Sequence, residues 1–244
     1  MGASIEREAS AVLKEAEDLA QVDTPEELLA LLVFTGLVLL LIWIAYRLDS
    51  APVWELENID EFTKQADQHK VLFAGSWNPP HAGHVAILRA LAKRHGLVYA
   101  CVGHNAKKTY TVSAEQRAAL VRAVVDADPV LRGRVKVITS TGYVWRDAKR
   151  LNCVALYPGI RSWRAYGMGE NALHVLNLVG PLLLGPGLRP VATRYLAADA
   201  AHRDISSSKV HRRVAAHEAL DGLVPRAIKA DVRQLYAPRD AKIA

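Results

Sequence analysis

The stretch Ala74-Gly-Ser-Trp-Asn-Pro-Pro-His-Ala-Gly-His84 decides the fold of this chain. The apolar run Val71–Phe73 precedes it and predicts a short buried strand, whereas the segment His84–His95 has apolar residues at helical spacing. A glycine and two imidazoles therefore lie where a strand turns into a helix. In open α/β sheets, this is the place where ligands bind.

The residues of this turn predict a site for a phosphorylated ligand. Main-chain N–H groups at the start of a helix attract phosphate. Gly83 leaves room for the close approach of a nucleotide, and His81 and His84 can place N–H donors on phosphate oxygens. A proline-rich turn with two incidental histidines is the alternative, and the strand–turn–helix context argues against it.

From residue 70 onward, strand and helix patterns alternate, and a capping box, Ser113-Ala-Glu-Gln116, opens one of the helices. Repeated βα units predict an α/β, Rossmann-like fold with a doubly wound parallel sheet. The expected strands cover residues 71–73, 97–102, 135–139, 153–157 and 190–196, and the expected helices cover 84–95, 113–126, 144–151, 165–178, 205–218 and 225–236.

The net charge of +6 conceals two regions of opposite sign. Residues 1–27 hold two basic and eight acidic residues, a net charge of −6, so the remainder carries +12. We expect an acidic N-terminal helix over 1–27. The basic remainder suits a polyanionic ligand, although a generic basic surface explains it equally well. The two cysteines are too few for a disulfide framework and form no C-x-x-C metal pattern.

Residues 28–46 form an uncharged run, LLALLVFTGLVLLLIWIAY, which predicts a single transmembrane helix. At about 1.5 Å per residue it spans roughly 28 Å, close to the hydrocarbon thickness of a bilayer. Its length and its acidic flank do not fit a signal peptide. A buried core helix is the alternative, but soluble helices are rarely apolar on every face.

The flanks of this run predict the topology of a single-pass membrane protein. Arg47 and the basic region follow the run, so the positive-inside rule puts the large domain on the cytosolic or matrix side, with an organelle inner membrane as one location. We expect residues 47–69 to be a linker and 70–238 to be the folded domain.

His81-Ala-Gly-His84 resembles the H-x-G-H signature of the nucleotidyltransferase superfamily, also called cytidylyltransferase-like, whose members attack the α-phosphate of ATP or CTP. Residues 70–236 are most similar to the phosphopantetheine adenylyltransferase family within it. Two further stretches carry that similarity: Asn105-Ala-Lys-Lys108 and Ile205-Ser-Ser-Ser-Lys-Val210. Taken separately, the first stretch is also explained by solvated loop lysines and the second by a serine N-cap.

The resemblance implies a nucleotidyltransferase fold and a set of functional residues. Transfer would proceed in line at the α-phosphate, with ATP or another adenine nucleotide as ligand, Mg²⁺ held mainly by the nucleotide, and a coenzyme A-like ligand as a further candidate. No metal-binding residues of the protein are expected. The implied catalytic residues are His84, Lys107 and Arg161, and the implied nucleotide-binding residues are Gly75, Ser76, His81, Gly83, His84, Arg161, Ser206, Ser207 and Ser208.

The chain departs from that family where the family binds its phosphopantetheine acceptor. Pro158 replaces the first arginine of the family's Arg-Gly-Leu-Arg stretch, and Arg161 matches the second. The family's usual carboxylates fall on Ala165 and Gly169, although Glu170 is one position away. Proline carries no charge and no side-chain donor, so a contact with the acceptor phosphate is lost.

Two functions follow from these features. The first is a degenerate, nucleotide-binding accessory subunit of a membrane complex, with a mitochondrial complex as one candidate, anchored in the bilayer through residues 28–46. The alternative is an active adenylyltransferase that transfers AMP to 4′-phosphopantetheine or a related acceptor and releases pyrophosphate. A nucleic-acid partner rests on the basic charge alone, because the chain lacks interleaved aromatic and basic residues.

Overall fold

The computed structural model describes residues 24–47, 56–58, 67–103, 110–140, 142–160 and 191–238, with the backbone alone at 42–47 and 56–58. The chain divides into two compact units, residues 1–44 and 45–244. Residues 1–23 of the helix expected over 1–27, and the whole helix expected over 165–178, lie outside the described residues.

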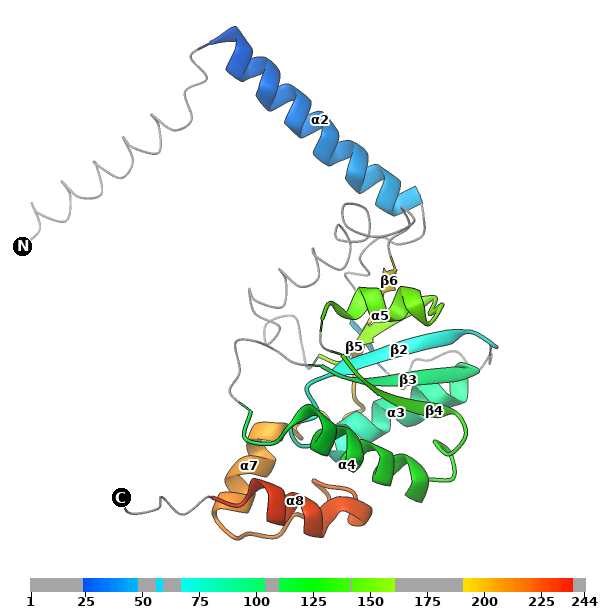
Figure 1. Cartoon of the computed structure of the whole chain (residues 1–244), viewed down its shortest axis with the longest axis vertical. Helices are drawn as coiled ribbons and strands as arrows, with labels where there is room; N and C mark the ends of the chain where they lie inside the picture. Colours follow the sequence, from blue (N-terminus) through cyan, green and yellow to red (C-terminus); the bar gives the residue numbers. More distant parts are fainter. Residues whose placement is uncertain are drawn as a thin grey trace, which may run out of the picture. The chain divides into compact units, whose positions relative to one another are not determined.

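The larger unit is built on a parallel sheet whose strands run in the order β4-β3-β2-β5-β6 (Figure 1). The chain thus moves from β2 outward to β4 and then crosses to β5 on the other side of β2. This reversal makes the gap between β2 and β5 the topological switch point of the sheet. The strands are β2 (Lys70–Gly75), β3 (Leu97–Val102), β4 (Val135–Thr139), β5 (Ala155–Pro158) and β6 (Ala192–Thr193).

Helices cover both faces of this sheet because its central strands bury alternate residues on opposite sides. Helices α3 (Ala82–Arg94) and α4 (Ala114–Ala127) lie on one face, in a core that contains Val71 and Phe73 of β2. Helix α5 (Val144–Arg150) lies on the other face, where Leu72 packs in the core of Trp145 (Figure 1). The predicted parallel α/β fold is confirmed.

The C-terminal elements extend the core on the side of α3 and α4. They are α7 (Ser207–Ala215), a 3₁₀ turn η2 (Arg226–Ile228) and α8 (Lys229–Tyr236), and η2 packs against α4. Apolar residues of all three, including Val210, Ile228 and Val232, are buried in the same cluster as β2. This packing brings the N-terminal end of α7 toward the carboxyl edge of the sheet.

Most element bounds agree with the sequence prediction. Strands β3 and β4 have the predicted bounds, and the capping box is present: Gln116 N donates to Ser113 Oγ over 3.1 Å and Ser113 N to Gln116 Oε1 over 3.0 Å. The strand expected over 190–196 is divided into β6, which pairs with β5, and β7 (Tyr195–Ala197), which belongs to a separate two-stranded sheet.

Part of the segment predicted to be a linker over 47–69 is a strand. Strand β1 (Leu56–Asn58) pairs in parallel with β7, with Leu56 opposite Tyr195. Three residues are too few to show a recognisable alternation in the sequence, and the pairing partner lies far along the chain. The folded unit therefore begins before residue 70.

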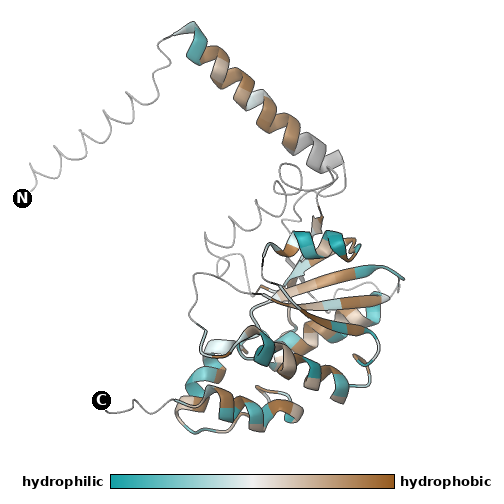
Figure 2. Cartoon of the chain, in the orientation of Figure 1, coloured by the Kyte–Doolittle hydropathy of each residue, from teal (hydrophilic) through white to brown (hydrophobic). Residues whose placement is uncertain are grey.

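The smaller unit contains one described helix, α2 (Pro25–Arg47), whose side chains are described as far as Leu41. Its large apolar side chains between Leu28 and Leu40 are 36–65% exposed, and apolar residues cover most of its described length (Figure 2). Among the residues that the structure describes, no helix combines the length and the apolar character needed to cross a membrane. The span predicted over 28–46 is thus not confirmed.

Candidate functional site

The loop that joins β2 to α3, residues 76–81, lies at the switch point of the sheet. Strand β2 ends at Gly75, and α3 begins at Ala82 with His81 as its N-cap. His81 is in an extended conformation (φ −141°, ψ 169°) and its side chain does not cap the helix. The side chain of His81 therefore leaves the first turn of α3 uncapped, although the N–H of Ala82 donates to Leu223 O.

The two predicted histidines stack on each other at the start of α3. Their ring centroids are 3.7 Å apart with an interplanar angle of 25°, and the ring of Trp77 lies 4.7 Å from that of His84. Burial, together with the neighbouring His81, holds the pKa of His84 well below its usual range. His84 is therefore a neutral imidazole at neutral pH, which donates a single N–H.

Polar side-chain atoms beside this pair are buried without a hydrogen-bond partner. They include Nδ1 of His84 and Oδ1 of Asn78. Buried polar atoms without partners are costly and uncommon in folded proteins. One of them on the 76–81 loop and one in the first turn of α3 make this edge of the sheet a candidate site for a polar ligand.

A second helix N-terminus meets this loop. The side chain of Ser206 caps α7 by accepting from Lys209 N over 3.2 Å, and the hydroxyl of Ser207 donates to Pro79 O over 3.1 Å. On α3, a Cβ on Gly83 would lie 3.2 Å from His202 O and 3.2 Å from His81 Nδ1. Gly83 thus packs closely against the segment that precedes α7, and a side chain at position 83 would require these neighbours to shift.

Side chains from distant helices hold the main chain of the 76–81 loop. Arg117 of α4 donates to Ser76 O, and His211 of α7 donates through Nε2 to Asn78 O over 3.1 Å. The N–H of Ala82 donates to Leu223 O over 2.8 Å. Arg117 is 1% exposed and did not emerge from the sequence, where an arginine on a helix is indistinguishable from a solvated one.

The structure brings most of the predicted nucleotide-binding residues to one edge of the sheet. Gly75 ends β2, where a Cβ would lie 3.2 Å from Trp77 Nε1, so glycine permits the fold of the loop. The hydroxyl of Ser207 donates a hydrogen bond to Pro79 O, a contact with the loop that the sequence did not predict. The other predicted residues at this edge are Ser76, His81, Gly83, His84, Ser206 and the exposed Ser208, whereas Lys107 and Arg161 lie outside the described residues.

Pro158 lies at the same switch point. It is the last residue of β5 and pairs with Ala74 of β2, one residue before Gly75. Its neighbour Gly159 faces the core, since a Cβ there would lie 3.2 Å from Ile87 Cδ1. The other positions that differ from the phosphopantetheine adenylyltransferase family, Ala165, Gly169 and Glu170, lie outside the described residues.

The donors that the loop offers suit an anion rather than a cation. They are imidazole and hydroxyl groups and main-chain N–H groups, whereas Mg²⁺ prefers carboxylate and other oxygen ligands. Within the described part of the chain, no group of three His, Cys, Asp or Glu side chains is arranged to hold a metal ion.

Comparison with known protein families identifies the family of this domain. The family described as Cytidylyltransferase-like matches residues 72–213, more than half of the 244 residues. The chain belongs to this cytidylyltransferase-like family. The matched region begins in β2 and ends in α7, so it contains the 76–81 loop and both helix N-termini.

Individual relatives are similar to most of the chain. The phosphopantetheine adenylyltransferase of Streptococcus pyogenes serotype M5 (strain Manfredo) is 27% identical over 166 residues, which are 67% of this chain and 94% of that protein. The enzyme of serotype M1 gives the same values. A crystal structure assigned as a nicotinate-nucleotide adenylyltransferase from Vibrio parahaemolyticus aligns with a TM-score of 0.46 and 11% identity, over 71% of this chain and 98% of that one.

Proposed function

We propose that this cytidylyltransferase-like domain binds the phosphates of an adenine nucleotide between the N-termini of α3 and α7. The observation that carries the proposal is the convergence of two helix N-termini at the switch point, beside a buried His84 Nδ1 without a partner. Aligned helix dipoles and imidazole donors favour phosphate. The 27% identical relatives named adenylyltransferases favour adenine as the base.

The chain's own residues would then position the nucleotide. His84 donates an N–H to the α-phosphate region, where charge develops during in-line transfer, while His81 and the Ser206–Ser208 start of α7 bind the outer phosphates. Mg²⁺, which such enzymes use with ATP, would be carried by the phosphates, because the described donors do not suit a divalent cation. The predicted roles of Lys107 and Arg161 belong to the same proposal.

We further propose that the domain is a degenerate accessory subunit. Pro158 supports this, because it lies beside Gly75 at the site edge and replaces an arginine that the phosphopantetheine adenylyltransferase family uses there. A bidentate guanidinium–phosphate contact is strong and charge-assisted, so its loss weakens acceptor binding. The second candidate, an active adenylyltransferase, is favoured by the intact His81–His84 pair.

Two measurements on the full chain test these functions. Calorimetric titration with ATP and Mg²⁺ should show binding, and no detectable binding would refute the nucleotide site. A coupled pyrophosphate assay with ATP and 4′-phosphopantetheine should stay near background. Turnover of order 1 s⁻¹ or more, abolished in His84→Ala, would instead establish a working enzyme within the ordinary range of rates.

We propose separately that residues 28–46 anchor the chain in a membrane. The uncharged run at 28–46 and the exposed apolar side chains of α2 support a single-pass anchor in a lipid bilayer, with the basic domain on the cytosolic or matrix side and other membrane-complex subunits as partners. Carbonate should leave the full chain in the membrane fraction, whereas a variant with Leu32→Lys and Leu39→Lys should be released. Release of the unmodified chain would refute the anchor.

A further inference from the structure

We infer that Arg117 is a positioning residue for the nucleotide site, one that joins the carboxyl ends of β2 and β3 and so sets the 76–81 loop. This inference rests on the proposed nucleotide binding and concerns how the site is held. Arg117 lies on α4, between the sheet and the C-terminal helices, and is 1% exposed. It contacts the loop through the main-chain carbonyl of Ser76 and has no described contact with His81 or His84.

The geometry of Arg117 links two strand ends. Its Nη1 donates to Ser76 O, the first residue after β2, and over 3.1 Å to Gly103 O, the first residue after β3. The N–H of Gly103 in turn donates to Gly75 O over 2.9 Å. One guanidinium therefore fixes the point at which the loop leaves the sheet, and displacement of that point moves Trp77 and both histidines.

Packing alone does not account for a charge at this position. Among the described residues Arg117 has no ion pair with a carboxylate, and its Nε has no hydrogen-bond partner. Removing a guanidinium from water costs several kcal/mol, and apolar residues of similar volume often replace such charges without loss of stability. Two carbonyl oxygens and the ring of Tyr110 offset the cost of burying the guanidinium. The centroid of that ring lies 4.3 Å from Cζ of Arg117.

The loop receives its other fixed points from α7. His211 and Ser207 hold the carbonyls of Asn78 and Pro79, two and three residues after Ser76. Arg117 thus fixes the start of the loop from α4, and α7 fixes its middle. If both contacts are required for the stacked imidazoles to face the ligand, the release of either must change the site.

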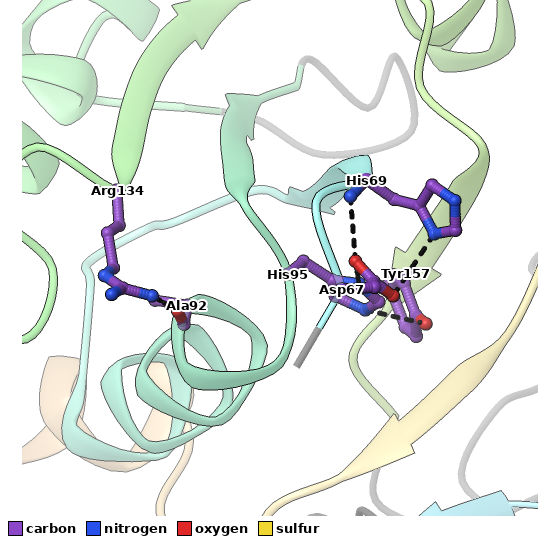
Figure 3. Close-up of polar contacts among 6 residues, drawn as sticks. All are labelled: Asp67, His69, Ala92, His95, Arg134 and Tyr157. Carbon is purple, nitrogen blue, oxygen red and sulfur yellow. Dashed lines mark hydrogen bonds and ion pairs between the residues drawn. The ribbon is translucent and has the colours of Figure 1, made fainter. Parts of the chain in front are cut away.

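The test uses the full chain in detergent and compares Arg117→Lys and Arg117→Met with a matched control, Arg134→Met. Arg134 is an exposed arginine that also donates to a main-chain carbonyl, Ala92 O, over 3.2 Å at the C-terminal end of α3 (Figure 3). We expect both Arg117 variants to weaken ATP binding tenfold or more in calorimetry, which corresponds to about 1.4 kcal/mol. The Arg134 control should remain within twofold of the unmodified protein.

A second readout does not depend on nucleotide. The Cε1–H resonance of His84, assigned with His84→Gln, reports the titration of the ring. In Arg117→Lys the pKa of His84 should move toward its ordinary value, because the released loop admits water, whereas Arg134→Met should leave it unchanged.

The outcomes separate the inference from the proposed function. If the unmodified protein binds no ATP, the proposed function fails and the His84 titration still decides the role of Arg117. If a folded Arg117→Lys keeps both its ATP affinity and its His84 titration, the inference is wrong. If both Arg117 variants fail to fold, Arg117 serves the core as a whole and the inference is equally wrong.

Discussion

Two histidines at different ends of the β2–α3–β3 unit, each with a buried ring nitrogen, differ in how those nitrogens are used. His95 follows α3 and is 4% exposed. Its Nδ1 lies 2.9 Å from both carboxylate oxygens of Asp67, and its Nε2 lies 3.1 Å from the hydroxyl of Tyr157 (Figure 3). His84, at the opposite end of α3, has a buried Nδ1 without a partner.

The partners of His95 determine its tautomer. Burial lowers the pKa of His95, against the hydrogen bond and charge of Asp67, which raise it. Partial burial opposes ionisation of Asp67, but hydrogen bonds from His95 and from the His69 N–H lower the pKa of that carboxyl overall. Neutral His95 therefore donates Nδ1–H to an ionised Asp67 and accepts the hydroxyl proton of Tyr157 at Nε2.

The difference distinguishes a ring whose nitrogens both have partners within the fold from a ring that leaves one nitrogen for a ligand. A ring whose two nitrogens are both satisfied stabilises the fold and has nothing left for a ligand. A ring with a buried, unsatisfied nitrogen costs stability until a ligand supplies the partner. The sequence singles out His84 by its place in the strand–turn–helix, but it does not show that both ring nitrogens of His95 have partners.

The largest effect should follow from removal of His95. His95→Ala leaves the Asp67 carboxylate and the Tyr157 hydroxyl without their partner, so we expect a loss of about 3 kcal/mol in the free energy of unfolding. Urea denaturation measures it, while ATP affinity should be unchanged. His69→Ala is the control, because its ring lies 3.2 Å from the same carboxylate but its side chain is 61% exposed. Equal losses of unfolding free energy in His95→Ala and His69→Ala would show that the buried contacts of His95 do not stabilise the fold in particular.

Removal of His84 should give the reverse pattern. His84→Ala deletes a donor to phosphate, and we expect ATP affinity to fall by about 1.5–3 kcal/mol, roughly ten- to a hundredfold. The urea midpoint should fall less than in His95→Ala, because the deleted Nδ1 has no partner in the free protein and only the packing of the ring is lost. A variant that is destabilised as much as His95→Ala, with normal ATP affinity, would show that His84 is structural.

The pH dependence of stability should sharpen the comparison. The pKa values of His84 and His95 are both lower in the folded state than in the unfolded chain, so the unfolded state binds more protons. Stability is fully present above the unfolded histidine pKa of about 6.5 and falls as the pH drops below it, by up to about 1.4 kcal/mol per pH unit for each ring. Urea midpoints between pH 8 and 5 measure this slope. ATP should flatten the part due to His84, since a bound anion favours its protonation, and an identical slope with ATP would argue against the site.

The smallest effect concerns Ser207. Its hydroxyl holds Pro79 O, so Ser207→Ala should cost about 1 kcal/mol of folding free energy, a typical value for one hydrogen bond. The neighbouring Ser208 is exposed, and Ser208→Ala should leave the urea midpoint unchanged. If neither variant changes the midpoint, the Ser207–Pro79 bond does not fasten the loop.

The sequence determined the local elements and where the ligand-binding turn would form. The bounds of β3 and β4, the capping box at Ser113 and the strand–turn–helix at Gly75–His84 all follow from periodicity and turn chemistry, which act between residues close in the chain. Those short-range signals also predicted a parallel α/β fold. They could not predict β1, because its pairing partner β7 is distant.

Only the tertiary structure decided which side chains hold the site and which hold the core. The bonds to Ser76, Asn78 and Pro79 span 41, 133 and 128 residues of chain. Hydrogen-bond partners at such separations depend on how α4 and α7 pack on the sheet, and no local pattern encodes that. For the same reason His84 and His95 differ in role, because 62 residues separate His95 from the Tyr157 hydroxyl that satisfies it and nothing described in the folded chain satisfies His84 Nδ1.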